Sequence, residues 1–158
     1  MSHVSVVELE VKDLAALKEA CEAIGLEFVE GQTSFKWYGR WMNDYDAHDA
    51  AYRRGIDPKN YGRCKHAIRI PGDSKAYEVG VVAKQDGSGY ELCWDSWSGG
   101  FGLQAYVGKD CENLKHEYAK VTVKKSVSKS MKKWGFRLAR EEFDKTTGET
   151  KLTLKRYN

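Results

Sequence analysis

Residues 77–102 read YEVGVVAKQDGSGYELCWDSWSGGFG, and this stretch decides the fold. Asp86-Gly87 is a favoured pair for a two-residue hairpin turn, because both central positions need positive φ. This turn fixes a register that places apolar and aromatic pairs on one face: Val79 with Trp94, Val81 with Leu92 and Ala83 with Tyr90. The other face pairs Glu78 with Asp95, Gly80 with Cys93 and Val82 with Glu91. A slip of one residue would bury three carboxylates and expose Trp94, so the register is strongly specified.

A glycine-rich aromatic loop follows the predicted hairpin. Residues 95–102, DSWSGGFG, hold too many glycines for a strand and show no helical period. Glycines permit tight turns and the close approach of a backbone to a ligand. Two interpretations stay open. The loop caps the core with buried aromatics, or it contacts a ligand through Asp95, Trp97 and Phe101.

The remaining chain predicts one α+β domain over residues 1–158. Period-two alternation predicts a strand over 4–11, Asp13 caps a helix over 14–24 that ends at Gly25, and a closing hairpin turns at Thr147-Gly148. Residues 39–64 are the least regular part, with a short helix expected over 47–54 behind an Asp46 cap. We expect an antiparallel sheet of about six strands with two main helices on one face, in a ferredoxin-like or related split arrangement.

The longest predicted helix covers residues 110–134, with Asp110 as its cap. Its apolar face changes sides: Leu114, Tyr118 and Val121 share one side, and Val123, Val127, Met131 and Trp134 share the opposite side. The helix is therefore kinked near 121–123, or its two ends touch different layers. Beyond residues 121–123 the helix has a basic face that lies away from the apolar stripe. It is formed by Lys125, Lys129, Lys132 and Lys133.

Charge is unevenly distributed along the chain. The net charge is +3. Residues 1–55 hold six Lys and Arg against ten Asp and Glu, whereas residues 109–158 hold fourteen against seven. A basic C-terminal third attracts an anionic partner, or docks on the acidic N-terminal third of the same or another copy. The second option predicts a homo-oligomer.

Composition and sequence pattern also restrict the class of protein. No run approaches the ~20 apolar residues of a membrane span, and the first residues lack the pattern of a secretory signal. Cys21, Cys64, Cys93 and Cys111 have wide, irregular spacing, so we interpret them as free thiols in a reducing, cytosol-like compartment.

Catalytic and metal sites are poorly supported. The one tempting pair is Glu78 with Asp95, since two close carboxylates serve as acid and base or bind a divalent cation. The alternative is a solvated polar face. The acidic group at residues 44–49 is better explained by helix capping than by a metal. No nucleophile, phosphate-loop or dinucleotide motif occurs, so we predict no cofactor and no metal.

Several motifs together resemble a known family. They are Met1-Ser2-His3, Tyr77 to Val82, Tyr90-Glu91-Leu92 with Trp94-Asp95 and Trp97, Leu114-Lys115 with Glu117-Tyr118-Ala119, and the closing Gly135-Phe136 hairpin. The chain resembles an uncharacterised family of conserved plastid-genome reading frames with cyanobacterial and bacteriophage relatives. Residues 39–64 depart from that pattern. The resemblance implies a protein of a stroma-like or bacterial cytosol and carries no catalytic residues.

The function that these observations favour is non-catalytic binding of an anionic, aromatic ligand, a nucleotide or short nucleic acid, which the protein would hold or sequester. Trp97 or Phe101 would stack on the ligand, and the lysines of the basic face would contact its phosphates. Two alternatives stay open: a protein-interaction or assembly module that uses the charge asymmetry, and a metal-dependent hydrolase that uses Glu78 and Asp95.

Overall fold

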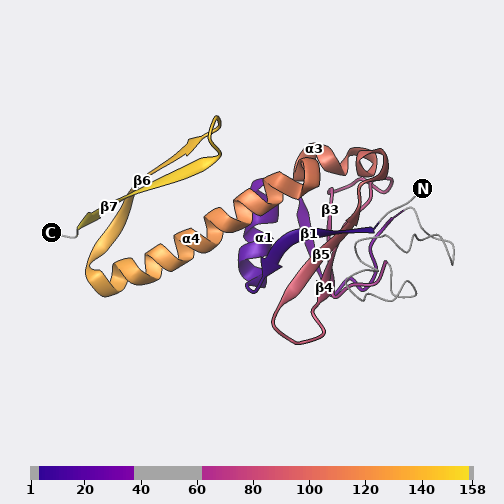
Figure 1. The fold of residues 1–158 in the computed structure, drawn as a ribbon, viewed down its shortest axis with the longest axis horizontal. Helices are drawn as coiled ribbons and strands as arrows, with labels where there is room; N and C mark the ends of the chain where they lie inside the picture. The colour runs from indigo at the N-terminus through magenta and orange to yellow at the C-terminus, as the bar shows by residue number, and fades with distance from the viewer. Residues whose placement is uncertain (1–3, 38–61, 157–158) are drawn as a thin grey trace.

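The computed structural model describes residues 4–37 and 62–156, and these form an α+β fold with antiparallel strands, as predicted (Figure 1). The main sheet has five strands: β1 (Val4–Val11), β2 (Glu27–Glu30), β3 (His66–Arg69), β4 (Val79–Ala83) and β5 (Tyr90–Asp95). Their order is β1-β5-β4-β3-β2, and all neighbours are antiparallel. The closing hairpin, β6 (Phe136–Asp144) with β7 (Glu149–Arg156), forms a separate two-stranded sheet.

Two main helices accompany the strands, α1 (Leu14–Ala23) and α4 (Glu112–Trp134). Between β5 and α4 lie a 3-10 segment η2 (Trp97–Gly102), the short helix α3 (Leu103–Val107) and a 3-10 turn η3 (Lys109–Cys111). In the described residues four strands lie between α1 and the next helix, so the order is not the β-α-β-β-α-β order of a ferredoxin-like domain. The helix expected over 47–54 lies outside the described residues.

The central hairpin has the predicted register. Gly80, Val81, Val82 and Ala83 pair with Cys93, Leu92, Glu91 and Tyr90. Trp94 is 2% exposed, so the aromatic face is the buried one, as predicted. The turn differs from the predicted one. Gly87 has φ of 74°, but Asp86 has no positive φ. The Gly87 N–H donates to the Lys84 carbonyl, and the Lys84 N–H donates to the Gly89 carbonyl, so the strands are joined by a four-residue loop, 85–88.

The other face of the sheet is also buried, which the sequence interpretation missed. A second apolar cluster contains Val4, Val6, Phe35, Ala67 and Cys93. Gly80 is essential to this packing: a Cβ on Gly80 would lie 2.3 Å from Cδ1 of Phe35, so only glycine lets that ring rest on the strand. The expected solvated polar face is therefore wrong. The segment around Phe35 covers it.

The helix α4 connects two layers. Its first half packs on α1 and the sheet through Leu114, Tyr118 and Val121, which are all buried. The Tyr118 hydroxyl accepts hydrogen bonds from the backbone N–H groups of Lys12 and Asp13, which fixes the start of α1. The second half contacts the β6–β7 hairpin instead. Of the two alternatives for this helix, the structure shows the one in which its ends touch different layers.

The two helix starts differ from each other. Asp13 caps α1 as predicted, since its side chain accepts from the backbone N–H of Ala16 at 3.0 Å. Asp110 does not cap α4. It lies in a left-handed turn with φ of 53°, and α4 begins at Glu112 without a side-chain cap. The turn reorients the chain between α3 and α4, so the capping position falls on Cys111.

The second half of α4 and the hairpin project away from the main sheet (Figure 1). We call residues 120–156 the arm. The arm holds twelve Lys and Arg against four Asp and Glu. None of the described helices is long and apolar enough to cross a membrane.

Candidate anion-binding site

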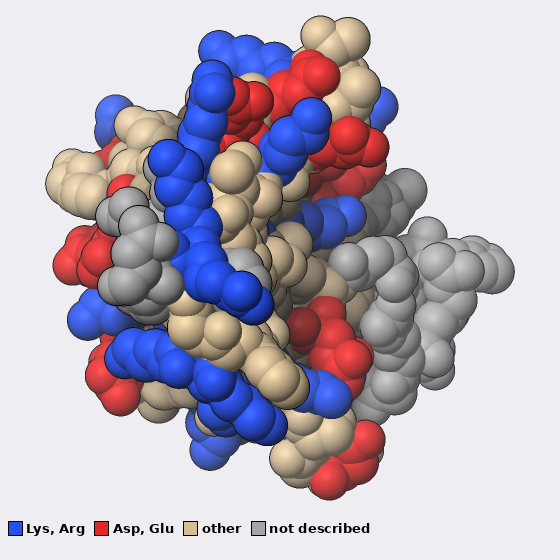
Figure 2. Space-filling view, turned by 90° about the vertical axis from the view of Figure 1, so that its left-hand side faces the viewer, with Lys and Arg blue, Asp and Glu red and all other residues tan. Residues whose placement is uncertain are grey.

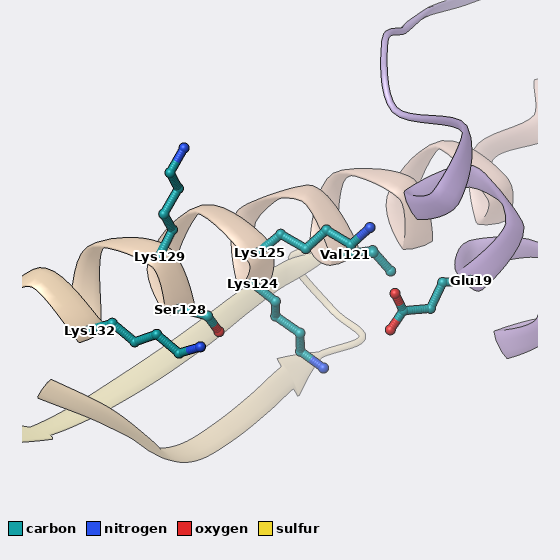
Figure 3. A pocket seen from close by; sticks show the side chains of 7 residues that line it. All are labelled: Glu19, Val121, Lys124, Lys125, Ser128, Lys129 and Lys132. Carbon is teal, nitrogen blue, oxygen red and sulfur yellow. The ribbon is translucent and has the colours of Figure 1, made fainter.

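A groove runs along one side of α4 on the arm (Figure 3). Its volume is about 470 Å³, and it is lined by Glu19 of α1 and, from α4, by Val121, Lys124, Lys125, Ser128, Lys129 and Lys132. The α4 residues recur three and four positions apart, so they form one continuous stripe of the helix. Four of these six side chains are lysines, and the groove is therefore strongly basic.

The lysines of the groove differ in how they are neutralised. Lys124 forms an ion pair with Glu141 of β6, and Lys125 lies 3.4 Å from Oδ2 of Asp13. Lys129 and Lys132 have no carboxylate within ion-pair distance among the described residues. These two ammonium groups supply positive charge that the rest of the described structure does not balance, and such groups attract phosphates and carboxylates.

The side chains spread to cover a surface rather than a point. Figure 3 shows Lys124 and Lys132 reaching to one side of the helix, Lys129 extending to the other, and Lys125 lying along the helix towards Val121. The carboxylate of Glu19 faces the groove from α1 and moderates its potential at that end. Seen from the end of the arm, blue side chains run down the middle of the face, and red ones lie mostly towards its edges (Figure 2). An extended anion fits this distribution better than a single small one.

An exposed tryptophan ends α4, on a different side of the helix from the groove lysines. Trp134, the last residue of α4, is 68% exposed, and the Lys133 ammonium lies 5.6 Å from its ring centroid. The sequence interpretation assigned Trp134 to an apolar stripe with Val123, Val127 and Met131. Only Met131 of that stripe is buried, while Val123 is half exposed. Lys133 lies outside the groove but beside this ring, where a planar ligand group would meet a cation and an aromatic face together.

The hairpin holds part of the basic face in place. Glu141 points towards α4 and pairs with both Lys120, at 3.0 Å, and Lys124. These two lysines hold the pKa of the Glu141 carboxyl below its ordinary value, with the Lys124 hydrogen bond as the largest cause. Near the hairpin tip, the rings of Phe143 and His116 are 4.6 Å apart. The hairpin thus orders the lysines on one side of α4 and leaves Lys129 and Lys132 available.

The aromatic loop is exposed rather than buried. Trp97 is 40% and Phe101 46% exposed, so the interpretation as a closed cap over the core does not hold for these side chains. Phe101 contacts Tyr77 edge-on at 4.9 Å and Trp97 at 5.6 Å between ring centroids. The loop also carries an unusual backbone, because the run from Ser98 to Gly102 has positive φ throughout. For Phe101 this left-handed conformation is strained, and strain of this kind is often found at functional sites.

Asp95 anchors the loop instead of facing a ligand. It is fully buried at the end of β5, where it pairs with Val4 of β1, and its Oδ1 accepts from the backbone N–H of Trp97 at 2.9 Å. Glu78 is 5% exposed and accepts from the Lys36 backbone N–H and the Gln32 side chain. The expected solvated face for this pair is wrong. Both carboxylates have structural hydrogen bonds, and the described residues contain no group of three or more His, Cys, Asp or Glu that would hold a metal ion.

The structure does not bring the loop and the basic face to one point. The loop lies next to α3, and α3 in turn packs on α4 (Figure 1). Because an α-helix rises about 1.5 Å per residue, Lys125 and Lys132 lie about 20 and 30 Å along the axis from Glu112. One mononucleotide therefore does not reach both Trp97 and Lys129. The predicted site residues divide into a basic set on the arm and an aromatic set at the opposite end of α4.

The four cysteines do not form a reactive site. No disulfide links them, and the structure describes all four. Burial raises the pKa of the Cys21 and Cys111 thiols to about 12, and that of Cys64 to about 11. Thiols of this kind behave as small apolar core groups.

Comparisons with protein-family models, curated proteins and solved structures found no match for this chain. The family resemblance of the sequence motifs stays a prediction.

Proposed function

We propose that the protein is a non-catalytic binder of short single-stranded nucleic acid, and that the arm is its binding surface. The observation that carries this proposal is the lysine stripe of α4, in which Lys129 and Lys132 have no carboxylate partner among the described residues. The exposed ring of Trp134 lies on another side of the helix, beside Lys133. Phosphate contacts by lysines and base stacking on aromatic rings are the two interactions that single-strand binders combine.

The separation of charges supports a polymer over a mononucleotide. The lysines of the stripe are spread over residues 124–132, about 12 Å along the helix axis. A stacked strand advances about 3.4 Å along its axis for each phosphate. A strand of three to five nucleotides therefore matches the stripe, while a single phosphate uses only one or two of its lysines.

The proposal is tested by fluorescence anisotropy with a labelled oligothymidylate of twelve nucleotides, measured over a range of salt concentrations. The triple variant Lys129→Gln, Lys132→Gln, Lys133→Gln removes three cations that have no ion-pair partner among the described residues. A matched control, Lys12→Gln, Lys18→Gln, Lys65→Gln, removes the same charge from exposed positions off the arm. We expect the first variant to bind more weakly with a reduced salt slope, and the control to bind as the wild type does. Equal binding by both variants would refute the proposal.

Trp134 gives an independent test at the same surface. Replacing it with alanine removes a stacking partner worth about 1–3 kcal/mol per base. Because the side chain is 68% exposed, its loss should change the free energy of unfolding by only about half a kcal/mol. Unchanged affinity in Trp134→Ala would exclude stacking at the end of the arm.

A second candidate function is a protein-interaction module, and exposed apolar side chains on the arm favour it. Val123, Phe143 and Leu154 are all between 42% and 50% exposed, and they lie on the same arm as the lysines. Light scattering without nucleic acid separates the two functions: dimers at both high and low salt favour a module that associates through these apolar side chains, and a monomer at both favours nucleic-acid binding.

A further inference from the structure

The outer face of α4 connects the two sets of site residues, and Glu112 in the first turn is its one carboxylate. Six further positions at helical spacing form this face: Lys115, Ala119, Thr122, Ser126, Lys129 and Lys133. All are exposed or half exposed, and none is acidic. Glu117 and Glu141, two carboxylates next to this region, are turned to the side where they meet Lys120. Beyond Glu112, a phosphate backbone lying along this face meets cations and small side chains from Lys115 to Lys133.

At the far end of this face the loop offers flat apolar surface. Trp97 and Phe101 are tilted ring neighbours, and Tyr77, itself buried, supports Phe101 from below. Asp95 fixes the first residue of the loop from inside the protein. The rings are therefore held at a set position, and the conformational entropy lost when a base stacks on them is small.

We propose that one nucleic-acid strand spans both ends, with its bases stacked on Trp97 and Phe101 and its phosphates on the lysines of the arm. This inference rests on the proposed function and specifies the length of the nucleic-acid strand that the protein binds. The part of the path along α4, about 20–30 Å, alone corresponds to about six to nine nucleotides at an axial rise of about 3.4 Å each, so the strand has at least that length. The loop reads single strands only, because the bases of a duplex are already stacked on each other.

The test is a length series of oligothymidylates of 4, 8, 12 and 16 nucleotides, with a 12-base-pair duplex, measured against four proteins. They are the wild type, Trp97→Ala, Trp97→Phe and the triple variant Lys129→Gln, Lys132→Gln, Lys133→Gln. For the wild type we expect affinity to rise steeply between 4 and 12 nucleotides and then to level off. For Trp97→Ala we expect unchanged binding of the 4-mer and the duplex. Its affinity for the 12-mer should fall about fivefold to 150-fold, the loss of one stacked base. Trp97→Phe keeps a flat ring and should recover most of that affinity.

The outcomes separate the two proposals. If Trp97→Ala binds the 12-mer and 16-mer as tightly as the wild type, the loop is not a contact and the spanning strand is wrong. If Trp97→Ala loses the same factor at every length and for the duplex, a spanning strand is also wrong. If the triple lysine variant loses binding at every length while Trp97→Ala binds at every length as the wild type does, the arm is the only site and the spanning strand is wrong. Undiminished binding of the 4-mer by that variant refutes the proposed function itself.

Discussion

Two substitutions of the strained residue Phe101 separate the energetic cost of its backbone conformation from the contribution of its ring contacts. Phe101 has φ of 54° and ψ of 45°, the left-handed region in which a Cβ costs about 1–2 kcal/mol. Phe101→Ala removes the ring but keeps the Cβ, while Phe101→Gly removes both. The two variants lose the same ring contacts with Tyr77 and Trp97, so these contacts cancel in the comparison. In the middle of an ordinary helix or strand, a glycine lowers the free energy of unfolding by about 0.5–1 kcal/mol relative to an alanine.

At this position the order should reverse. Relief of the strain outweighs the larger chain entropy of glycine in the unfolded state, so we expect Phe101→Gly to be more stable than Phe101→Ala by about 1 kcal/mol. For a domain of this size that is a difference of about 2–4 °C in Tm, measured by thermal and urea unfolding followed by circular dichroism. An equal or higher Tm for Phe101→Ala would show that the loop does not hold this residue in the left-handed region. The inference that strain is retained there for function would then lose its basis.

Three further predictions concern the core and the arm. Trp94→Ala should lower the free energy of unfolding by about 3–5 kcal/mol, because it empties a buried aromatic position; a loss below about 1 kcal/mol in urea titration would contradict the packing of β5. Since the folded pKa of Glu141 is lowered, its stabilisation is present above its ordinary value of 4.5 and is lost as the pH falls through the folded value. Unfolding midpoints between pH 3 and 6 should therefore fall less steeply in Glu141→Gln than in the wild type. Cys21 and Cys111 should resist alkylation at pH 8 in the native protein and react on unfolding, as followed by mass spectrometry; rapid native labelling of either would disprove their burial.

The central hairpin was predictable because turn chemistry and alternation agreed. Asp86-Gly87 placed the turn correctly although its two-residue geometry was wrong, and a slip of one residue would expose Trp94. The second buried face was not predictable in the same way. Glu78 and Asp95 alternate with apolar residues and resemble a solvent face, but Phe35, more than forty residues earlier in the chain, covers it. The hydrogen bonds that satisfy Glu78 come from that same distant segment, and a local pattern does not contain them.

The candidate site shows the same division between local and tertiary information. The lysine stripe follows directly from helical spacing, and Lys125, Lys129 and Lys132 do line one groove. Trp134 was missed because periodicity placed it on an apolar stripe, and only the position of the hairpin decides which residues of that stripe are covered. The distance between loop and lysines was also beyond local reasoning. It depends on α4 running as one uninterrupted helix away from the sheet.

The salt dependence of oligonucleotide binding tests the central claim most directly. For single strands, the slope of log K against log salt changes by about 0.7 for each phosphate that a cation neutralises. Removing Lys129, Lys132 and Lys133 should therefore reduce the slope for the twelve-nucleotide oligothymidylate by about 2, and the control variant at Lys12, Lys18 and Lys65 should keep the wild-type slope. A triple variant on the arm with the wild-type slope and affinity would contradict the account, because the arm would then make no contact with the phosphates.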